Sequence, residues 1–229
     1  MRLLNLILCL LLWPWVGCGP APRTIDPELG SSHPLYDQLV QKTVIITSKN
    51  VASVRLTAGG GTEFTVDEHA TSRAITAGRG CLVSTGGLVL TAAHNLVDLP
   101  RFKLFVFTDG AFQECRGTTL SVGDPDEADT DVALIRVEGV RDHACFVVDR
   151  GAAIGAKVLK YGFGFASGSI VDRQSTATAD VISCRIAAEQ GESGGPVVDY
   201  QGRLLGISSR ITGFHGHLEI VLPKQLPND

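Results

Sequence analysis

Apolar and polar positions alternate in short runs after residue 41, and glycine-rich turns separate the runs. A period of two is typical of half-buried β-strands, and no helical period extends beyond two turns in this part of the chain. One short helix is predicted earlier, at residues 35–40. The pattern therefore predicts an all-β protein. Strands are predicted at 43–47, 51–57, 81–84, 88–92, 103–107, 118–122 and 132–137 in one half, and at 156–161, 169–173, 178–183, 196–198, 204–209 and 218–222 in the other.

The two halves are similar in length and in number of strands, and a natural division falls near residues 139–149. We expect two six-stranded β-barrels, at residues 36–140 and 141–229, because closure removes exposed strand edges. A cleft between two barrels is a usual place for a binding site. A sandwich or a single barrel also agrees with the periodicity. With 229 residues, 44% of them apolar, the chain can bury a core of this size.

The N-terminus has a different pattern. Residues 3–16 are uncharged and rich in leucine, and a basic residue precedes them, which is typical of a signal peptide at 1–17. A spanning helix needs about 20 apolar residues, so a membrane-anchor helix is the weaker interpretation. The string WVGC that ends at Cys18 resembles a bacterial lipobox and predicts lipidation of that cysteine. The proline-containing stretch 18–35 is expected to tether an exported domain to a membrane of the bacterial cell envelope.

Charge and cysteine content limit the choice of partners and cofactors. The formal net charge is −4 without any Lys/Arg-rich run, so no nucleic-acid partner is expected. Cys81, Cys115, Cys145 and Cys184 are an even set in an oxidising compartment, which predicts disulfides and leaves three pairings open. Because no CxxC pair occurs, a zinc or redox site is weakly supported. No cofactor or metal is predicted.

Three short segments carry the groups that peptide hydrolysis needs. A strand of sequence LTAAH ends at His94, and Asp131 directly precedes the apolar run VALI, with Asp129 as its rival. Ser193 lies in the string GESGGPVV, where glycines permit left-handed backbone and let successive N–H groups point at one place. Each segment alone is ordinary, since strand-end histidines, turn aspartates and glycine-rich turns are common. Their combination is highly specific.

In the order His, Asp, Ser, these segments resemble the chymotrypsin-like (trypsin) family of serine peptidases. Residues 78–94 look particularly like its bacterial branch, which includes the periplasmic HtrA-type proteases. The resemblance extends from about residue 51 to residue 223, and no PDZ module is expected after it. It implies a chymotrypsin-like two-barrel fold and a serine endopeptidase that acts on polypeptides through an acyl-enzyme.

The resemblance also implies a role for each residue. His94 would be the general base, Asp131 its orienting carboxylate and Ser193 the nucleophile. These roles agree with the chemistry, because a serine hydroxyl attacks well only when an imidazole removes its proton and a carboxylate fixes that imidazole. The N–H groups of Gly191 and Ser193 would form the oxyanion hole. Ser209 matches the serine that bonds the triad carboxylate and begins the substrate-binding strand.

Substrate specificity is harder to infer. By its spacing from the nucleophile, Ala187 is expected at the base of the specificity pocket, where trypsin has an aspartate. Glu219, or His215 and His217, are candidates to line the pocket, although surface positions are the commoner role for such residues. The two histidines are a poor metal site because no carboxylate or cysteine is convincingly placed beside them.

Glu192 stands where the pancreatic relatives have an aspartate that pairs with a newly cleaved amino terminus. No activation sequence of that kind occurs in this chain. We therefore expect Glu192 to face solvent or to pair with a fixed cation such as an arginine. In that case kcat/KM stays flat to about pH 10, because arginine keeps its charge there.

Two alternatives belong to other classes. The string GxSxG also fits the nucleophile elbow of α/β-hydrolases, but that fold requires a histidine after the serine and alternating helices. Only residues 194–229 follow Ser193, and no helices are predicted there. The second alternative is a catalytically inactive lipoprotein that binds partners through a peptidase fold. Against it, no member of the triad is missing.

Overall fold

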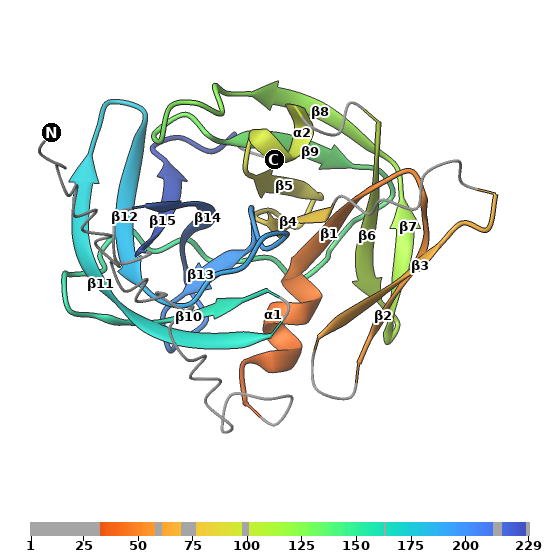
Figure 1. The fold of residues 1–229 in the computed structure, drawn as a ribbon, viewed down its shortest axis with the longest axis horizontal. Coiled ribbons are helices and arrows are strands. Elements are labelled where there is room, and N and C mark those ends of the chain that lie inside the picture. Colours follow the sequence, from red (N-terminus) through yellow and green to blue (C-terminus); the bar gives the residue numbers. More distant parts are fainter. Residues whose placement is uncertain are drawn as a thin grey trace, which may run out of the picture.

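The fold is known from a computed structural model that describes residues 33–57, 61–69, 77–97, 101–162, 164–212 and 217–227. The predicted signal peptide and Cys18 lie outside the described residues, and so does His215. The described chain forms two β-lobes with a short helix between them (Figure 1). Within these ranges, no helix combines the length and hydrophobicity that crossing a membrane requires.

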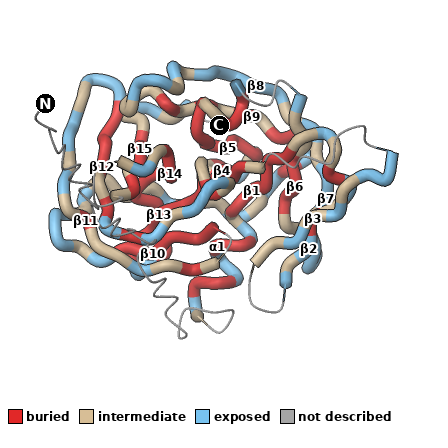
Figure 2. The backbone as a smooth tube through the Cα atoms, viewed as in Figure 1, coloured by how far each residue is buried: buried red, intermediate tan, exposed pale blue. Residues whose placement is uncertain are grey.

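The first lobe is an antiparallel sheet of seven strands in the order β7-β6-β1-β4-β5-β9-β8. Its central strands are buried on both faces and mostly apolar, whereas the edge strand β8 is largely exposed (Figure 2). A separate hairpin of β2 and β3 packs its apolar side chains against this lobe. The strands are β1 (Thr43–Ser48), β2 (Val51–Leu56), β3 (Thr62–Val66), β4 (Ala77–Leu82), β5 (Leu88–Thr91), β6 (Phe102–Thr108), β7 (Ala111–Cys115), β8 (Gly117–Val122) and β9 (Ala133–Val137).

The second lobe is a closed barrel in the order β10-β11-β12-β15-β14-β13. Pairing of β10 with β13 closes the ring, so none of its six strands leaves an open edge. The strands are β10 (Lys157–Tyr161), β11 (Phe165–Ser175), β12 (Ala179–Arg185), β13 (Pro196–Val198), β14 (Leu204–Thr212) and β15 (His217–Pro223).

Helix α1 (Tyr36–Lys42) joins the two lobes. Asp37 in its first turn and Lys42 in its last turn both interact favourably with the helix dipole. Its buried face, with Leu39 fully buried, belongs to one hydrophobic cluster with residues of both lobes. In that cluster the ring of Tyr36 meets Tyr161 edge-on, with 6.1 Å between ring centroids. The lobes are therefore held by a shared core and not only by the connecting chain.

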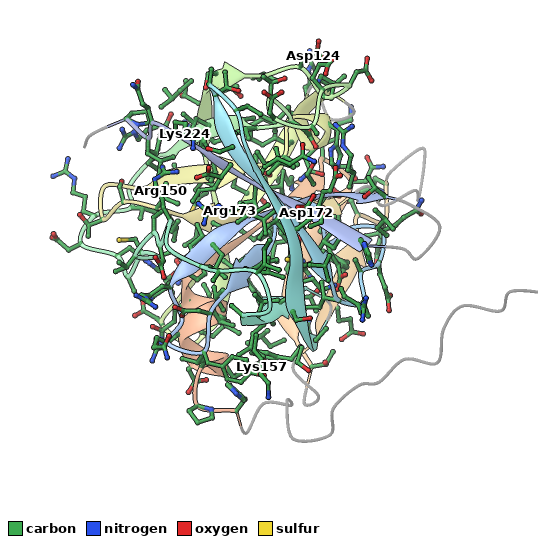
Figure 3. All side chains as sticks on the ribbon, turned by 90° about the vertical axis from the view of Figure 1, so that its left-hand side faces the viewer. Asp124, Arg150, Lys157, Asp172, Arg173 and Lys224 are labelled. Carbon is green, nitrogen blue, oxygen red and sulfur yellow. The ribbon has the colours of Figure 1, made fainter. Side chains whose placement is uncertain are left out.

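Asp180, at the start of β12, lies in a network of cations at one side of the barrel. Its carboxylate, 3% exposed, is 2.5 Å from Lys224 Nζ, 3.3 Å from Arg173 Nη2 and 3.7 Å from Arg150 Nη1. Figure 3 shows Arg150, Arg173 and Lys224 on the same side of the barrel. Burial alone would raise the pKa of this carboxyl. Hydrogen bonds from Lys224 and Ser175, together with the positive charges, outweigh burial and lower the pKa.

The predicted all-β, two-lobed chymotrypsin-like fold is confirmed. The second lobe has the expected six strands and is closed. The first lobe differs, because its sheet has seven strands and the β2–β3 hairpin pairs separately. Strands β3 and β7 were not predicted. Both are short and half-exposed, and β3 pairs only with its hairpin partner.

The predicted disulfides are not formed, because Cys81, Cys115, Cys145 and Cys184 are free thiols. Cys81 is buried in the cluster between the lobes, and Cys184 is buried in the core of the second barrel. Cys115 and Cys145 are half-buried against the core of the first lobe. An even number of cysteines indicates only that pairing is available. The packing of these side chains separates Cys81 and Cys184 from the other two, and Cys115 and Cys145 are free thiols against one core.

Candidate active site

Strand pairing in the first lobe brings His94 and Asp131 together. Strand β5 pairs with β9, with Thr91 opposite Ala133, so the end of one strand lies beside the start of the other. His94 begins the single-turn helix α2 (His94–Val97) directly after β5, and Asp131 lies just before β9. The His94 Nδ1 atom is 3.1 Å and 2.9 Å from the two carboxylate oxygens of Asp131, and the His94 backbone N–H donates to Oδ1 over 3.1 Å.

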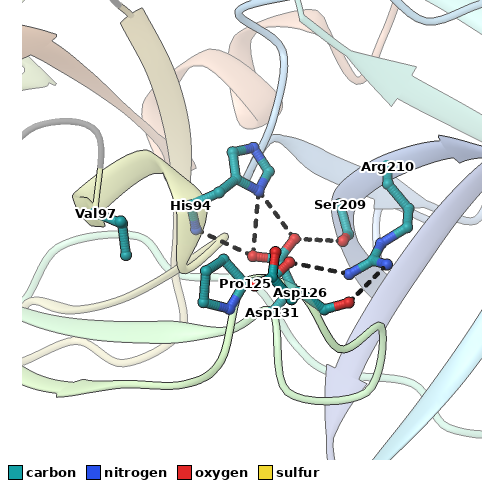
Figure 4. A pocket seen from close by; sticks show the side chains of 7 residues that line it. All are labelled: His94, Val97, Pro125, Asp126, Asp131, Ser209 and Arg210. Atoms are coloured by element: carbon teal, nitrogen blue, oxygen red, sulfur yellow. Dashed lines mark hydrogen bonds and ion pairs between the residues drawn. The ribbon is translucent and has the colours of Figure 1, made fainter.

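Ser209, on β14 of the second lobe, donates a hydrogen bond of 2.5 Å to Asp131 Oδ2 (Figure 4). The Asp131 side chain is 1% exposed, whereas that of His94 is 32% exposed. Burial would raise the pKa of the Asp131 carboxyl, but the hydrogen bonds from His94 and Ser209 outweigh it and lower the pKa. The carboxylate therefore stays charged, and it fixes the imidazole with Nε2 as the remaining ring nitrogen.

Ser193 lies in a tight turn between β12 and β13 that glycines make possible. Gly194 has a φ of 79°, and a Cβ there would lie 2.0 Å from the carbonyl oxygen of Arg79. The carbonyl of Ser193 accepts two hydrogen bonds from the first lobe, from Arg79 N at 2.7 Å and from Asn95 Nδ2 at 2.8 Å. Because Asn95 directly follows His94, the serine turn is fastened to the turn that carries the histidine.

Gly191 has a φ of 86°, which only glycine adopts without strain. In the described part of the chain, the N–H groups of Gly191 and Ser193 make no backbone hydrogen bond, whereas those of Glu192 and Gly195 do. Two donors of this turn therefore remain available to a bound group. No hydrogen bond joins His94 to Ser193 among the described residues, as is common when no substrate is bound.

The sequence model of the family described as a trypsin-like peptidase domain matches residues 78–207. This match includes His94, Asp131 and Ser193 and spans more than half of the chain. The chain belongs to this family. As a member of this family, it is a serine-type peptidase.

Solved structures of proteases share the fold of this trypsin-like peptidase. The Rv3671c protease of M. tuberculosis, in its active form, is 20% identical with a TM-score of 0.57, covering 82% of this chain and 79% of the other. The protease domain of MamO from Magnetospirillum magneticum is 18% identical with a TM-score of 0.57, covering 82% and 95%.

The HtrA-type protease AlgW, solved with a decapeptide, is 19% identical with a TM-score of 0.59, covering 82% of this chain. The present chain spans only 62% of the AlgW chain. At these identities the likeness shows the fold alone. Among curated proteins, none matches the sequence.

Two cavities of the trypsin-like peptidase meet at the candidate triad. A cavity of about 520 Å³ lies beside His94 and Asp131, and one of about 170 Å³ lies beside Ser193. Ser209 and Arg210, both on β14, line both cavities. The two cavities are therefore neighbours along this strand. Figure 4 shows the guanidinium of Arg210 directed toward the loop before Asp131, where the carbonyls of Pro125 and Asp126 accept its hydrogen bonds at 3.1 and 3.3 Å.

The expected specificity residues lie differently from their predicted places. The cavity beside Ser193 is lined by Ala188, and Ala187 is exposed and not part of its lining. Of the two neighbouring alanines, Ala188 lines this cavity, and the role predicted for Ala187 stays a prediction. Glu219 lies in a different cavity, of about 280 Å³, and its carboxylate is 4.0 Å from Arg210 Nε. His217 lines neither cavity beside the triad.

The two candidate aspartates, Asp129 and Asp131, make different contacts. Asp129 accepts a hydrogen bond of 2.8 Å from Thr178 on the loop before β12, and it is exposed to solvent. Asp131 is the carboxylate that contacts His94. Two further residues were not singled out from the sequence, Asn95 and Lys160. Asn95 could have been suspected from its position after His94, but Lys160 gave no signal beyond a cation in an apolar strand.

The described residues contain no group of three or more histidine, cysteine, aspartate or glutamate side chains placed to hold a metal ion. The arrangement of the site suits acid–base and nucleophilic chemistry by its side chains. A buried carboxylate orients an imidazole, and a serine lies in a turn with two available N–H donors.

Proposed function

We propose that this trypsin-like peptidase is a serine endopeptidase in which His94, Asp131 and Ser193 form the catalytic triad. The observation that carries the proposal is the Asp131 carboxylate, which contacts His94 Nδ1 at 2.9 Å and Ser209 Oγ at 2.5 Å. Hydrogen bonds at Nδ1 hold the imidazole in the tautomer whose Nε2 can accept a proton. The Asn95 contact with the Ser193 carbonyl keeps the serine turn beside that imidazole.

In the first half of the reaction, Ser193 Oγ attacks the carbonyl carbon of the scissile peptide bond while His94 Nε2 takes the hydroxyl proton. The N–H groups of Gly191 and Ser193 donate to the oxygen that becomes negative. The intermediate then breaks its C–N bond, and the leaving amine takes the proton from His94. The products are a free amine and an ester on Ser193, the acyl-enzyme.

In the second half, His94 removes a proton from water as the water oxygen attacks the ester carbonyl. Breakdown of that intermediate returns the proton to Ser193 Oγ and releases a carboxylic acid. Throughout, Asp131 stays ionised and stabilises the imidazolium. The lowered pKa of its carboxyl favours this role.

A fluorophosphonate probe, which reacts with activated serines, tests the assignment directly. The wild-type protein should be labelled and should cleave a denatured protein substrate, and Ser193→Ala should abolish both. Thr47→Val is the control, because it removes a buried hydroxyl that has no hydrogen-bond partner among the described residues and lines neither cavity beside the triad. Hydrolysis by Ser193→Ala at the wild-type rate would refute the triad, and an unlabelled, inert wild-type protein would instead favour a binding role.

The cavity beside Ser193 supports a substrate class. Apolar side chains of Ala188, Ile211 and Leu218 line it, and its volume is about 170 Å³. A pocket of this size and lining fits a small or medium apolar side chain before the scissile bond. Of the residues predicted for substrate binding, Ser209 adjoins this cavity, so its strand is the proposed binding edge.

We also propose export to the bacterial cell envelope with lipid on Cys18, for which the support is the string WVGC after an apolar leader. A Cys18→Ser protein expressed in bacteria should not incorporate labelled palmitate and should leave the membrane fraction. Unchanged membrane partition of a processed, unlabelled product would refute lipid anchoring. The inference about the triad does not depend on this outcome.

A further inference from the structure

A buried lysine lies directly beneath the turn that carries the nucleophile. Lys160, on β10 of the second barrel, is 3% exposed in its side chain, and its ammonium group donates a hydrogen bond to the Glu192 carboxylate, which is 6% exposed. Glu192 is the residue immediately before Ser193. Removing two charges from water is costly, and such a pair persists only with good geometry and further hydrogen bonds. The position of the pair is therefore well defined by the fold.

The Glu192 carboxylate also holds the start of the same turn. Its Oε2 accepts a hydrogen bond of 2.6 Å from the backbone N–H of Glu189. The backbone N–H of Glu192 in turn donates to the Glu189 carbonyl over 3.3 Å, and the N–H of Gly195 donates to the Glu192 carbonyl over 2.9 Å. The turn is thus fastened at both ends through one residue. Between these fixed points lie the N–H groups of Gly191 and Ser193.

The space for this arrangement is provided by Gly162. A Cβ at that position would lie 2.1 Å from Glu192 Oε1, so any side chain there would displace the carboxylate. The carbonyl of Gly162 accepts a hydrogen bond of 2.8 Å from the fully buried Arg79 of the first lobe. Lys160 therefore contacts the Glu192 carboxylate directly, Gly162 leaves room for it, and Arg79, held at the Gly162 carbonyl, lies close enough to feel its charge.

We propose that Lys160 is a positioning residue for the peptidase reaction and the element that makes it sensitive to alkaline pH. Its ammonium group holds Glu192, and through Glu192 it holds the turn in which the Gly191 and Ser193 N–H groups face the reacting carbonyl. This inference rests on the proposed function. The expectation from sequence was that Glu192 faces solvent or pairs with a fixed cation such as an arginine, and the cation in the structure is a lysine. Because the cation belongs to an internal strand, the turn needs no newly cleaved amino terminus.

A lysine behaves differently from an arginine at alkaline pH. Burial lowers the pKa of Lys160, the charges of Glu192 and Glu189 raise it, and the charge of Arg79 lowers it further, so the net direction is downward. The ammonium group is therefore lost below the ordinary lysine value of about 10.4. As pH rises through the Lys160 pKa, Glu192 loses the positive charge of Lys160 and keeps the Glu189 N–H, so the turn is held less firmly. The flat profile expected for an arginine becomes a profile with a falling alkaline limb.

The first experiment measures kcat/KM from pH 6 to 11 in folded protein, with circular dichroism at each pH. In wild type, kcat/KM should fall at alkaline pH. This fall should come from a decrease in kcat more than from an increase in KM. Lys160→Met should lower kcat by about 100-fold, the order found when an oxyanion donor is lost. The double variant Lys160→Met/Glu192→Gln removes both charges of the pair, and it should recover part of the rate with no alkaline limb. A Lys160→Met protein with the wild-type rate and profile would overturn the proposal, as would a flat wild-type profile to pH 10.4.

The second experiment works whether or not the protein hydrolyses peptides, so it separates this proposal from the proposed function. In the Ser193→Ala protein, ¹⁵N NMR follows the Gly191 amide, and ¹³C NMR follows the Lys160 side chain, across the same pH range. Both should titrate together, with a midpoint below the ordinary lysine value of about 10.4. A Gly191 amide that does not follow the Lys160 titration would refute the coupling even if wild type is an active peptidase. An inert wild type with coupled titration would refute the proposed function alone.

Discussion

Ser209 and His94 contact the same carboxylate from opposite lobes of the molecule. Ser209 Oγ, from the second lobe, donates to Asp131 Oδ2 over 2.5 Å, and His94 Nδ1, from the first lobe, lies 2.9 Å from the same oxygen. One buried carboxylate oxygen is therefore contacted from both lobes. This contact makes the position of the imidazole depend on the packing of the lobes as well as on the pairing of β5 with β9.

Ser209→Ala should lower kcat by about 10-fold, because a hydrogen bond to a charged group contributes about 1.5 to 3 kcal/mol and only part of it acts in the transition state. The sign of the pH effect on stability follows from the lowered pKa of Asp131. The stability that ionised Asp131 adds is fully present above the pKa of this carboxyl in the unfolded chain. It is lost as pH falls through the lower pKa of the carboxyl in the folded protein. The variant should therefore be less stable than wild type at pH 7, with the gap closing near pH 2.

Urea unfolding at both pH values measures that gap, and steady-state kinetics measure kcat. Ser208→Ala is the control, since the Ser208 hydroxyl is buried on the same strand without a hydrogen-bond partner among the described residues. Equal loss of kcat in both variants would show that any cavity on this strand has the same effect, and the role of the Ser209 contact would be wrong.

Asn95→Ala should lower kcat by about 5-fold to 10-fold with little change in global stability. The variant loses a neutral hydrogen bond, of about 1 kcal/mol, that holds the carbonyl of Ser193. Gly78→Ala should act in the same direction, because its new Cβ would lie 2.5 Å from the Asn95 side chain. The double variant should lose less than the product of the two single losses, since both act on one contact.

Gly164→Ala is the control for a glycine replacement in the same protein, because a Cβ there meets nothing within 4 Å. Measurements of kcat and KM for the four proteins decide the matter. Independent, fully multiplicative losses would contradict a shared contact between Asn95 and the serine turn.

Asp180→Asn should destabilise the fold by about 2 to 3 kcal/mol at pH 7, because it leaves partly buried cations around a neutral amide. The pKa of the Asp180 carboxyl is lowered, so its contribution is present above the unfolded pKa and lost as pH falls through the folded pKa. The difference between variant and wild type should therefore shrink toward pH 2. Urea unfolding at several pH values checks this.

Asp172→Asn is the matched control, an exposed carboxylate on the neighbouring strand β11 that accepts a long hydrogen bond of 3.5 Å from Gln174. It should change stability by less than about 0.5 kcal/mol. A loss in Asp180→Asn that does not depend on pH would mean that packing, and not charge, explains the effect.

The sequence predicted features that depend on short stretches of chain. His94, Asp131 and Ser193 each lie in a motif with a strand or a glycine turn next to it, and the strands of the closed barrel follow simple alternation. The short strands β3 and β7 were missed because each is only five residues long and half-exposed. The domain boundary placed between residues 140 and 141 stays a prediction.

Contacts between distant residues could not be predicted in the same way. Lys160 and Glu192 are 32 positions apart, and nothing in an apolar strand reveals that one cation is turned inward against a carboxylate. The same limit applies to Ala187. It was placed by its spacing from Ser193, whereas the lining of a cavity depends on the path of the segment after β12. The number of cysteines also did not reveal that they are free thiols, because that depends on how their side chains pack.

Ala188→Leu should narrow the choice of substrates, whereas Ala187→Leu should not. Two of the three charged residues that line the cavity, Glu192 and Arg210, are engaged elsewhere. Glu192 is held by Lys160 and by the Glu189 N–H, and Arg210 is held by two carbonyls. What remains for a substrate side chain is an apolar space of about 170 Å³, so peptides with alanine, valine or leucine before the scissile bond should be cleaved in preference to those with lysine, glutamate or tryptophan.

A larger side chain at 188 fills part of that space. In Ala188→Leu, kcat/KM for a leucine peptide should fall by about 10-fold to 100-fold, while that for an alanine peptide changes little, because each methylene is worth about 1 to 3 kcal/mol in such a pocket. Ala187 is exposed and outside the lining, so the same change there should leave both values within about 2-fold. Parallel peptide series on the three proteins give the comparison. If Ala187→Leu, and not Ala188→Leu, changes the preference, the cavity beside Ser193 does not hold the substrate side chain, and the position counted from the sequence was the right one.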